Sequence, residues 1–235
     1  MIKKSVKSVK KYLTWKKQQW KRKQLPNPNL SVALLLKSSL LLSAVVLQTS
    51  CASGPKRFDS YQEGRWQAKT LIQDLKQNKS YVVYIDVNAI RPDRVRLDVE
   101  TSLGIHVASL NYNRDKVQVV VPDQRKYYHG KASRKAFSKL VPLEIDPKWL
   151  SAILFDEDLK KYNWKCEYSN EGLASKCETK GLTAEWLKRE GGVRVVSLES
   201  KSAKVQMQLK NFRESAKQAE FYDIPKPAGF KSIKL

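Results

Sequence analysis

The chain has 235 residues, of which 45 are Lys or Arg and 23 are Asp or Glu, so its formal net charge is +22. This length suits one domain with a core of its own, which argues against a small scaffold that depends on metals or disulfides to fold. The basic excess favours an anionic partner, either lipid head groups or nucleic acid.

The first 51 residues have the order of a secretory signal. A basic run, Lys3 to Lys23, precedes an apolar run, Leu40–Leu47, and then Gln48-Thr49-Ser50-Cys51. The apolar run is too short to span a bilayer, which needs about 20 apolar residues, but it fits the core of a signal peptide. The order resembles a bacterial lipoprotein export signal. That resemblance implies that residues 1–50 are removed and that Cys51 becomes a lipid-carrying (palmitate-bearing) N-terminus.

Two features bear on this interpretation. The lipoprotein motif usually has Leu, Val or Ile three residues before the Cys, where this chain has Gln48. Ala52 follows the Cys in place of the Asp that often retains lipoproteins in the inner membrane, which favours the outer membrane. The alternatives are an uncleaved signal anchor and a basic tail that binds nucleic acid. After position 50 the chain keeps 34 basic and 23 acidic residues, an excess of +11 scattered through predicted strands, so we expect no nucleic-acid partner.

Residues 51–62 are polar and contain Gly54-Pro55, so we expect a flexible tether between the lipid and a domain at 63–235. The pattern of that domain predicts mostly antiparallel strands. The clearest alternates Val95, Leu97 and Val99 with charged residues. The predicted strands are Trp66–Leu75, Ser80–Ala89, Arg94–Thr101, Ile105–Asn111, Lys116–Val121, Tyr162–Tyr168, Ser175–Lys180, Leu182–Lys188, Val193–Glu199 and Lys204–Asn211, with Tyr127–Gly130 closing the first group and an extended end at Phe221–Phe230.

Two helices are expected midway along the domain. Ser133 can cap a helix over Arg134–Val141, and Asp146 can cap a second with Pro147 at its first position. We expect the acidic run Asp156–Asp158 that follows to be a solvated loop. The apolar face of the sheet must be covered, and the two helices can cover it. We therefore predict a mainly β fold, an open (half-closed) antiparallel β-barrel with two short helices over an apolar cavity.

Cys166 and Cys177 flank the turn signal Asn170-Glu171-Gly172 between two predicted strands. A disulfide between them would join a hairpin and would persist in an oxidising periplasm. The alternative is two unpaired thiols. A metal site is disfavoured because no further Cys or His lies at ligand spacing.

The sequence carries no sign of catalysis. His106 and His129 belong to no metal motif, and no nucleophile elbow, P-loop or dinucleotide fingerprint occurs. Cys166 as a nucleophile with His129 as its base is the one arrangement that would make an enzyme. We expect a non-enzyme without cofactors.

The segment Thr101–Asn111, in which Leu103-Gly104 separates two strands, resembles LolB, the outer-membrane lipoprotein receptor family. The pair of helices in Ala132–Phe155, the strands from Trp186 through Val205–Phe212, and the Pro-containing end Phe221–Phe230 are similar to further parts of the LolA/LolB-like carriers. Each piece is short, so the superfamily is the safer assignment.

The resemblance implies a monomer, lipid-anchored in the outer membrane and facing the periplasm. Such a protein accepts lipoproteins from a LolA-like periplasmic carrier and inserts them into the membrane. It also implies that Leu103 and Gly104 form a loop that contacts the membrane. LolB often has Pro before this Leu, where this chain has Ser102. The alternative places Leu103 inside a turn.

The predicted acyl-chain cavity is lined by apolar residues of strands and helices. They are Val95, Leu97, Val99, Phe137, Leu140, Trp149, Ile153, Val205, Met207 and Leu209. The same residues would also make an ordinary packed core. The competing function is therefore an envelope lipoprotein that transports nothing and acts as a scaffold or sensor.

Overall fold

The computed structural model describes residues 56–138, 140–141, 143–214 and 218–235. The described residues belong to one compact unit, Ser53–Leu235. Cys51 and the predicted signal peptide lie outside the described residues. Within the described part of the chain, no helix is both long and apolar enough to cross a membrane.

The described residues form twelve strands, two short α-helices and three 3-10 helices. The strands are β1 (Glu63–Asp74), β2 (Lys79–Ile90), β3 (Arg94–Glu100), β4 (His106–Asn113), β5 (Lys116–Val121), β6 (Lys126–Lys131), β7 (Lys165–Tyr168), β8 (Ala174–Thr179), β9 (Leu182–Glu190), β10 (Val193–Glu199), β11 (Ala203–Arg213) and β12 (Lys231–Lys234). The helices are η1 (Pro122–Gln124), α2 (Arg134–Phe137), α3 (Pro147–Leu154), η2 (Leu159–Tyr162) and η3 (Ala219–Tyr222).

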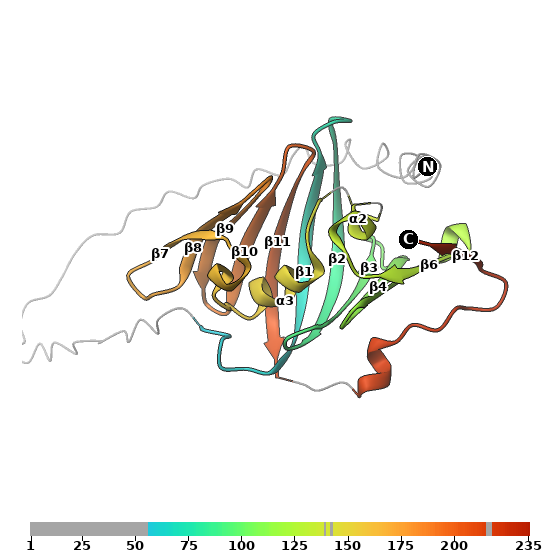
Figure 1. Cartoon of the computed structure of the whole chain (residues 1–235), viewed down its shortest axis with the longest axis horizontal. Helices are drawn as coiled ribbons and strands as arrows, with labels where there is room; N and C mark the ends of the chain where they lie inside the picture. Colours follow the sequence, from blue (N-terminus) through green and yellow to red (C-terminus); the bar gives the residue numbers. More distant parts are fainter. Residues whose placement is uncertain (1–55, 139, 142, 215–217) are drawn as a thin grey trace, which may run out of the picture. The chain divides into compact units, whose positions relative to one another are not determined.

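All twelve strands belong to one sheet, in the order β12-β6-β5-β4-β3-β2-β1-β11-β10-β9-β8-β7 (Figure 1). Neighbouring strands are antiparallel except β12 and β6, which are parallel. β7 and β12 do not pair with each other, so the sheet stays open. The predicted class, an open antiparallel barrel with two short helices, is confirmed.

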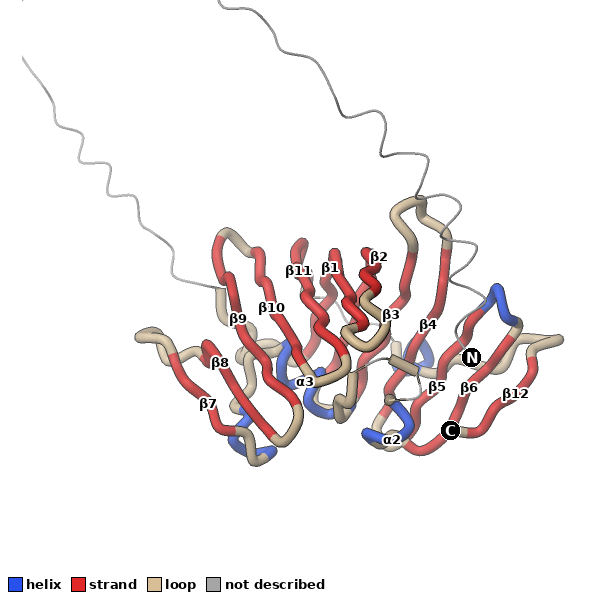
Figure 2. Tube along the Cα trace, turned by 90° about the horizontal axis from the view of Figure 1, so that it is seen from above, coloured by secondary structure: helices blue, strands red, loops and turns tan. Residues whose placement is uncertain are grey.

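The sheet is strongly curved, and α2 and α3 lie in its hollow (Figure 2). Val95 of β3 and Leu209 of β11 face this hollow and are almost fully buried, whereas Arg96 and Gln208, one position along, are on the outer side. Strand side chains alternate between faces, so the concave face carries the apolar residues and the convex face the polar ones. The core therefore lies between the concave face and the two helices.

Both predicted helix starts are confirmed. The Ser133 side chain accepts a hydrogen bond from Ala136 N at 3.1 Å, and the Asp146 side chain accepts one from Lys148 N at 3.0 Å. Each satisfies a backbone donor that the first helical turn leaves unpaired. The first helix was predicted too long: α2 ends at Phe137, and a turn follows. Val141 precedes a proline, which disfavours helical backbone at that position.

Two further corrections concern strands. The strand predicted over Tyr162–Tyr168 begins only at Lys165, because η2 takes up Tyr162 and Asn163 then adopts a left-handed conformation with φ 62°. The end of the chain is not merely extended. It adds β12 to the edge of the sheet, next to β6.

The segment that leads to β12 lies against the convex face of β3, β4 and β5, where Arg96, Asn113 and Gln118 donate hydrogen bonds to it. Tyr222 is fully buried there, and its carbonyl oxygen accepts hydrogen bonds from Asn111 and Asn113. Gln118 donates to the Asp223 carboxylate at 2.7 Å. We call residues 218–235 the C-terminal strap. It covers the convex face of these three strands, and Arg96, Asn111 and Gln118 beneath it donate hydrogen bonds to the strap.

The predicted tether, residues 51–62, is anchored in its second half. Phe58 is only 3% exposed and its ring lies 5.7 Å from that of Trp66 and 4.6 Å from that of Phe212. Burying an aromatic ring of this size against two others fixes the backbone that carries it. A flexible tether can therefore extend no further along the chain than Arg57.

Candidate functional site

The ten residues predicted to line a cavity come together in one apolar cluster. Val95, Phe137, Trp149, Ile153, Met207 and Leu209 are buried in it, and Leu97, Val99, Leu140 and Val205 are partly buried against it. They come from β3, β11, α2, the turn after α2, and α3. The concave face and the helices thus meet as predicted.

None of the ten residues lines either of two surface cavities found among the described residues. The larger cavity, about 340 Å³, opens at the end of the sheet where β1 begins. Its walls are mostly charged and include Arg57, Arg91, Asp156, Glu157 and Lys161. The buried side chains of α2 and α3 pack against the concave face, so an acyl chain lying on this face would have to replace them.

The C-terminal end of α3 is held to the sheet by Arg194 of β10. Its guanidinium donates to the carbonyl oxygens of Ile153 at 3.2 Å and Leu154 at 2.8 Å, and pairs with Asp156 at 2.7 Å. A cation beside the last carbonyls of a helix is favoured by the helix dipole. Burial lowers the pKa of Arg194 from its ordinary value, while Asp156 opposes the shift.

In the acidic run after α3, Asp158 is exposed as the sequence suggested, but Asp156 and Glu157 are not. The side chains of Asp156 and Glu157 are 1% and 4% exposed. Asp156 also pairs with Arg189 of β9 at 3.2 Å, and Glu157 pairs with Arg91 at 2.7 Å and with Lys161. Buried carboxylates need such partners, because an unpaired buried charge is costly. The partner arginines are far away in the sequence, so no local pattern revealed them.

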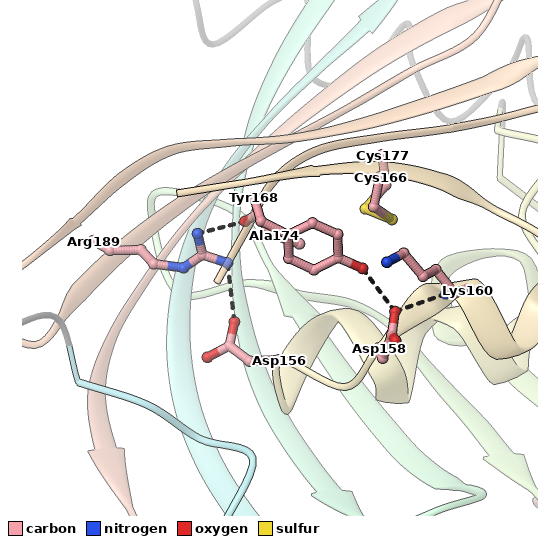
Figure 3. The surroundings of a disulfide bond; sticks show 8 residues. All are labelled: Asp156, Asp158, Lys160, Cys166, Tyr168, Ala174, Cys177 and Arg189. Carbon is pink, nitrogen blue, oxygen red and sulfur yellow. Dashed lines mark hydrogen bonds and ion pairs between the residues drawn. A yellow bond between two sulfur atoms is a disulfide. The ribbon is translucent and has the colours of Figure 1, made fainter. Parts of the chain in front are cut away.

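Cys166 of β7 and Cys177 of β8 form a disulfide, as predicted (Figure 3). This disulfide excludes the alternative in which Cys166 is a free nucleophile. Beside it, the Tyr168 hydroxyl donates to Asp158 at 2.9 Å. Burial, and then this hydrogen bond, raise the pKa of Tyr168 to about 12. The disulfide joins the last two strands at this edge of the sheet, and the tyrosine ties that edge to the loop that follows α3.

The loop between β3 and β4 leaves two apolar side chains in water. Leu103 is 63% exposed and Ile105 is 60% exposed, so Leu103 does not pack inside the turn. Thr101 shapes the loop, since its hydroxyl oxygen accepts from the backbone N–H groups of Leu103 and Ile105, both at 3.2 Å. Gly104 has φ 74°, a conformation that favours glycine. The sequence analysis named Leu103 and Gly104 but missed Ile105, although an apolar residue directly after the Gly was visible.

Two further predictions concern the lipid attachment site and metal binding. Cys51, the predicted lipid attachment site, lies outside the described residues. Among the described residues, no group of three or more His, Cys, Asp and Glu is placed to hold a metal ion.

No family model matches this sequence, and no curated protein matches it. Three solved structures are similar in fold. A LolA superfamily protein from Nitrosomonas europaea matches with a TM-score of 0.48 and 6% identity over 72% of this chain and 92% of its own. An uncharacterized conserved protein from Thermus thermophilus matches with a TM-score of 0.38 and 10% identity, over 73% and 90% of the two chains.

The third is a domain from Vibrio parahaemolyticus named as a candidate outer membrane lipoprotein-sorting protein. It matches with a TM-score of 0.41 and 7% identity, over 68% of this chain and 89% of that domain. The first of the three names mentions the LolA superfamily and the third mentions lipoprotein sorting. At identities of 10% or less and TM-scores below 0.5, these likenesses assign neither a family nor a function to the chain.

Proposed function

We propose that this chain is an envelope lipoprotein that accepts acylated lipoproteins from a periplasmic carrier and passes them into the outer membrane. The observation that carries the proposal is the apolar concave face of an open sheet, covered by only two short helices. A sheet that is not closed can hold an apolar ligand once its cover moves. In this proposal Cys51 carries the lipid anchor, and the domain faces the periplasm as a monomer.

The physical basis is the cost of exposing acyl chains to water. Each buried CH₂ group contributes about 0.8 kcal/mol, so a carrier of acylated cargo must offer a large apolar surface. Residues of α2 and α3 such as Phe137, Trp149 and Ile153 occupy that surface in the closed form. Acyl chains would replace these side chains as the neighbours of the sheet. The direction of transfer then follows from the difference in affinity between carrier, receptor and membrane.

Leu103 and Ile105 are the residues we assign to membrane contact. They protrude from a loop that is ordered by its own hydrogen bonds, so their exposure does not depend on disorder. Such side chains can enter the bilayer interface while the domain stays in water. The proposal requires no bond-making step, and we assign no catalytic residue and no cofactor.

The second candidate is an envelope lipoprotein with the same fold that transports nothing and serves as a scaffold or sensor. One observation favours it. Six of the ten predicted lining residues are buried in the apolar cluster and the other four are partly buried against it, and a permanently packed interior needs no cargo. The two candidates differ in whether α2 and α3 ever leave the sheet.

The deciding experiment is a transfer assay with purified components. Acylated lipoprotein bound to its periplasmic carrier is mixed with this protein and vesicles, and the cargo in each fraction is measured. We expect cargo to leave the carrier and reach the vesicles. Leu103→Glu should accept cargo yet release it poorly into vesicles, whereas Leu187→Glu, at a 50% exposed position on β9, should transfer normally. Cargo that stays on the carrier would refute the proposal.

A further inference from the structure

The convex face of β1 and β2 carries an apolar patch that the proposed function does not use. Leu71 of β1 lies directly opposite Val82 of β2, and Tyr84 follows Val82 on the same face. Val82 is 45% exposed and Tyr84 is 40% exposed. Outward positions of an antiparallel sheet are normally polar, and grouped apolar side chains on a surface mark an interaction site. We call Leu71, Val82 and Tyr84 the convex patch.

The patch continues into the loop that carries Leu103 and Ile105. Tyr84 pairs with Glu100, the last residue of β3, and the loop begins directly after it. Figure 2 shows this loop projecting from the sheet on the side away from α2 and α3, which is the convex side. The convex patch and the exposed loop therefore meet at one corner of the molecule and face the same way.

The C-terminal strap stops short of this corner. It covers the convex face of β3, β4 and β5 through Arg96, Asn111 and Gln118, while Val82 and Tyr84 of β2 stay exposed. The C-terminal strap thus forms one border of the exposed apolar area. A surface kept open beside a covered one is suited to a partner from outside the chain.

Charges of both signs border the patch: Glu100 lies opposite Tyr84 on the β3 side, and two lysines lie on the β1 and β11 side. Lys69 lies opposite Tyr84, and Lys210 of β11 lies one strand away beside Gln67. Both lysines are exposed, and neither makes an ion pair with the described residues. Lysines that flank exposed apolar side chains and a tyrosine match a bilayer with anionic head groups, since the apolar groups enter the interface and the ammonium groups meet phosphates.

We propose that the convex face of β1 and β2 docks side-on to an anionic bilayer, through the convex patch, Leu103, Ile105, Lys69 and Lys210. This rests on the proposed membrane attachment and adds the orientation and the lipid class. It also agrees with the length of the anchor. Cys51 precedes the buried Phe58 by seven residues, about 25 Å of extended chain at most. β1 spans roughly 36 Å, so a molecule standing on the β1–β2 turn would hold Phe58 beyond that reach, whereas a molecule lying on its convex face would not.

The test uses the full chain with Cys51→Ser, so that a thiol label reacts only with an introduced cysteine, because Cys166 and Cys177 are joined. An environment-sensitive fluorophore is placed at Val82→Cys, at Leu103→Cys and, as a matched control, at Leu187→Cys. Leu187 is 50% exposed and belongs to β9. With vesicles of phosphatidylethanolamine and phosphatidylglycerol, we expect emission from positions 82 and 103 to shift to the blue and emission from position 187 to stay unchanged.

The lysines are tested in the Val82→Cys background. Lys69→Gln and Lys210→Gln should each raise the vesicle concentration for half-maximal shift about fivefold, the factor that corresponds to about 1 kcal/mol per lysine near an anionic surface. Lys148→Gln on α3, in the hollow of the sheet, should leave this vesicle concentration unchanged. The shift at position 82 should disappear with vesicles of phosphatidylcholine alone.

Three outcomes would overturn the proposal: no shift at position 82 on bound vesicles, an equal shift at position 187, or equal shifts on neutral and anionic vesicles. A shift at position 103 without one at position 82 refutes side-on docking and leaves the transfer proposal intact. A shift at position 82 in a protein that fails the cargo-transfer assay supports side-on docking and refutes the transfer proposal.

Discussion

At the scale of single residues, the buried guanidinium of Arg194 holds the end of α3 on the sheet. It joins two helix carbonyls and the Asp156 carboxylate to β10. Arg194→Met keeps an unbranched apolar stem but leaves Asp156 with Arg189 as its single ion-pair partner and the two carbonyls without the guanidinium donor. Breaking a buried ion pair in this way costs about 3–5 kcal/mol. Urea unfolding should show that loss, while Lys188→Met, on the exposed side of β9, should change the free energy of unfolding by less than about 0.5 kcal/mol. Equal effects of the two substitutions would contradict the role given to Arg194.

Asp158 makes a prediction about pH. The backbone N–H of Lys160, and then the Tyr168 hydroxyl, lower its pKa below the usual value. A carboxyl whose pKa is lower in the folded state stabilises the fold above its unfolded pKa of about 3.9, and that stabilisation is lost as the pH falls toward the folded value. Asp158→Asn keeps a good cap for η2 but does not titrate. The difference in unfolding free energy between wild type and variant should be constant near neutral pH and shrink below about pH 4; a difference that is constant down to the lowest pH would refute this.

At the scale of elements, the β7–β8 hairpin forms one edge of the sheet and depends on its disulfide. β7 has four residues and pairs with β8 alone. A cross-link with a sequence separation of 11 lowers the entropy of the unfolded chain and so raises its free energy by about 3 kcal/mol. In the double variant Cys166→Ser/Cys177→Ser we expect hydrogen exchange in β7 and β8 to quicken far more than in β1 and β2. Uniform change across all strands would show that the bond stabilises the whole fold rather than this edge.

The elements differ in how well the sequence predicts them, for physical reasons. The alternation in β3 and the caps of α2 and α3 are local patterns, and these elements were found where they were expected. The strap and β12 were not, because β12 is a four-residue edge strand whose partner, β6, lies about a hundred residues earlier. Asp156 was wrongly placed in solvent for the same reason, since Arg189 and Arg194 are 33 and 38 residues away. The ten core positions were found. Whether they line a cavity or a packed core depends on how far α2 and α3 move, and the residue types at these positions do not reveal that movement.

At the scale of the whole molecule, the proposed function requires two states of one sheet. In the closed state described here, Arg194 and the apolar side chains of α3 hold the helix on the concave face. Acyl chains that bind the sheet must displace these side chains, because two groups cannot fill one space. Bound cargo stabilises only the state that holds it, so its binding energy must exceed the cost of moving the helices.

This argument predicts a specific change in hydrogen exchange. On loading with acylated cargo, the backbone amides of α3 should exchange faster, because the helix leaves its contacts with β10, while the central strands β1 and β2 should exchange more slowly, because ligand binding raises the stability of the folded sheet. A cargo of the same sequence without acyl chains provides the control and should change neither. If the acylated cargo slows exchange in α3 as much as in the sheet, or binds without affecting either, then the helices are a fixed part of the core. The scaffold or sensor function would then be the better account of this fold.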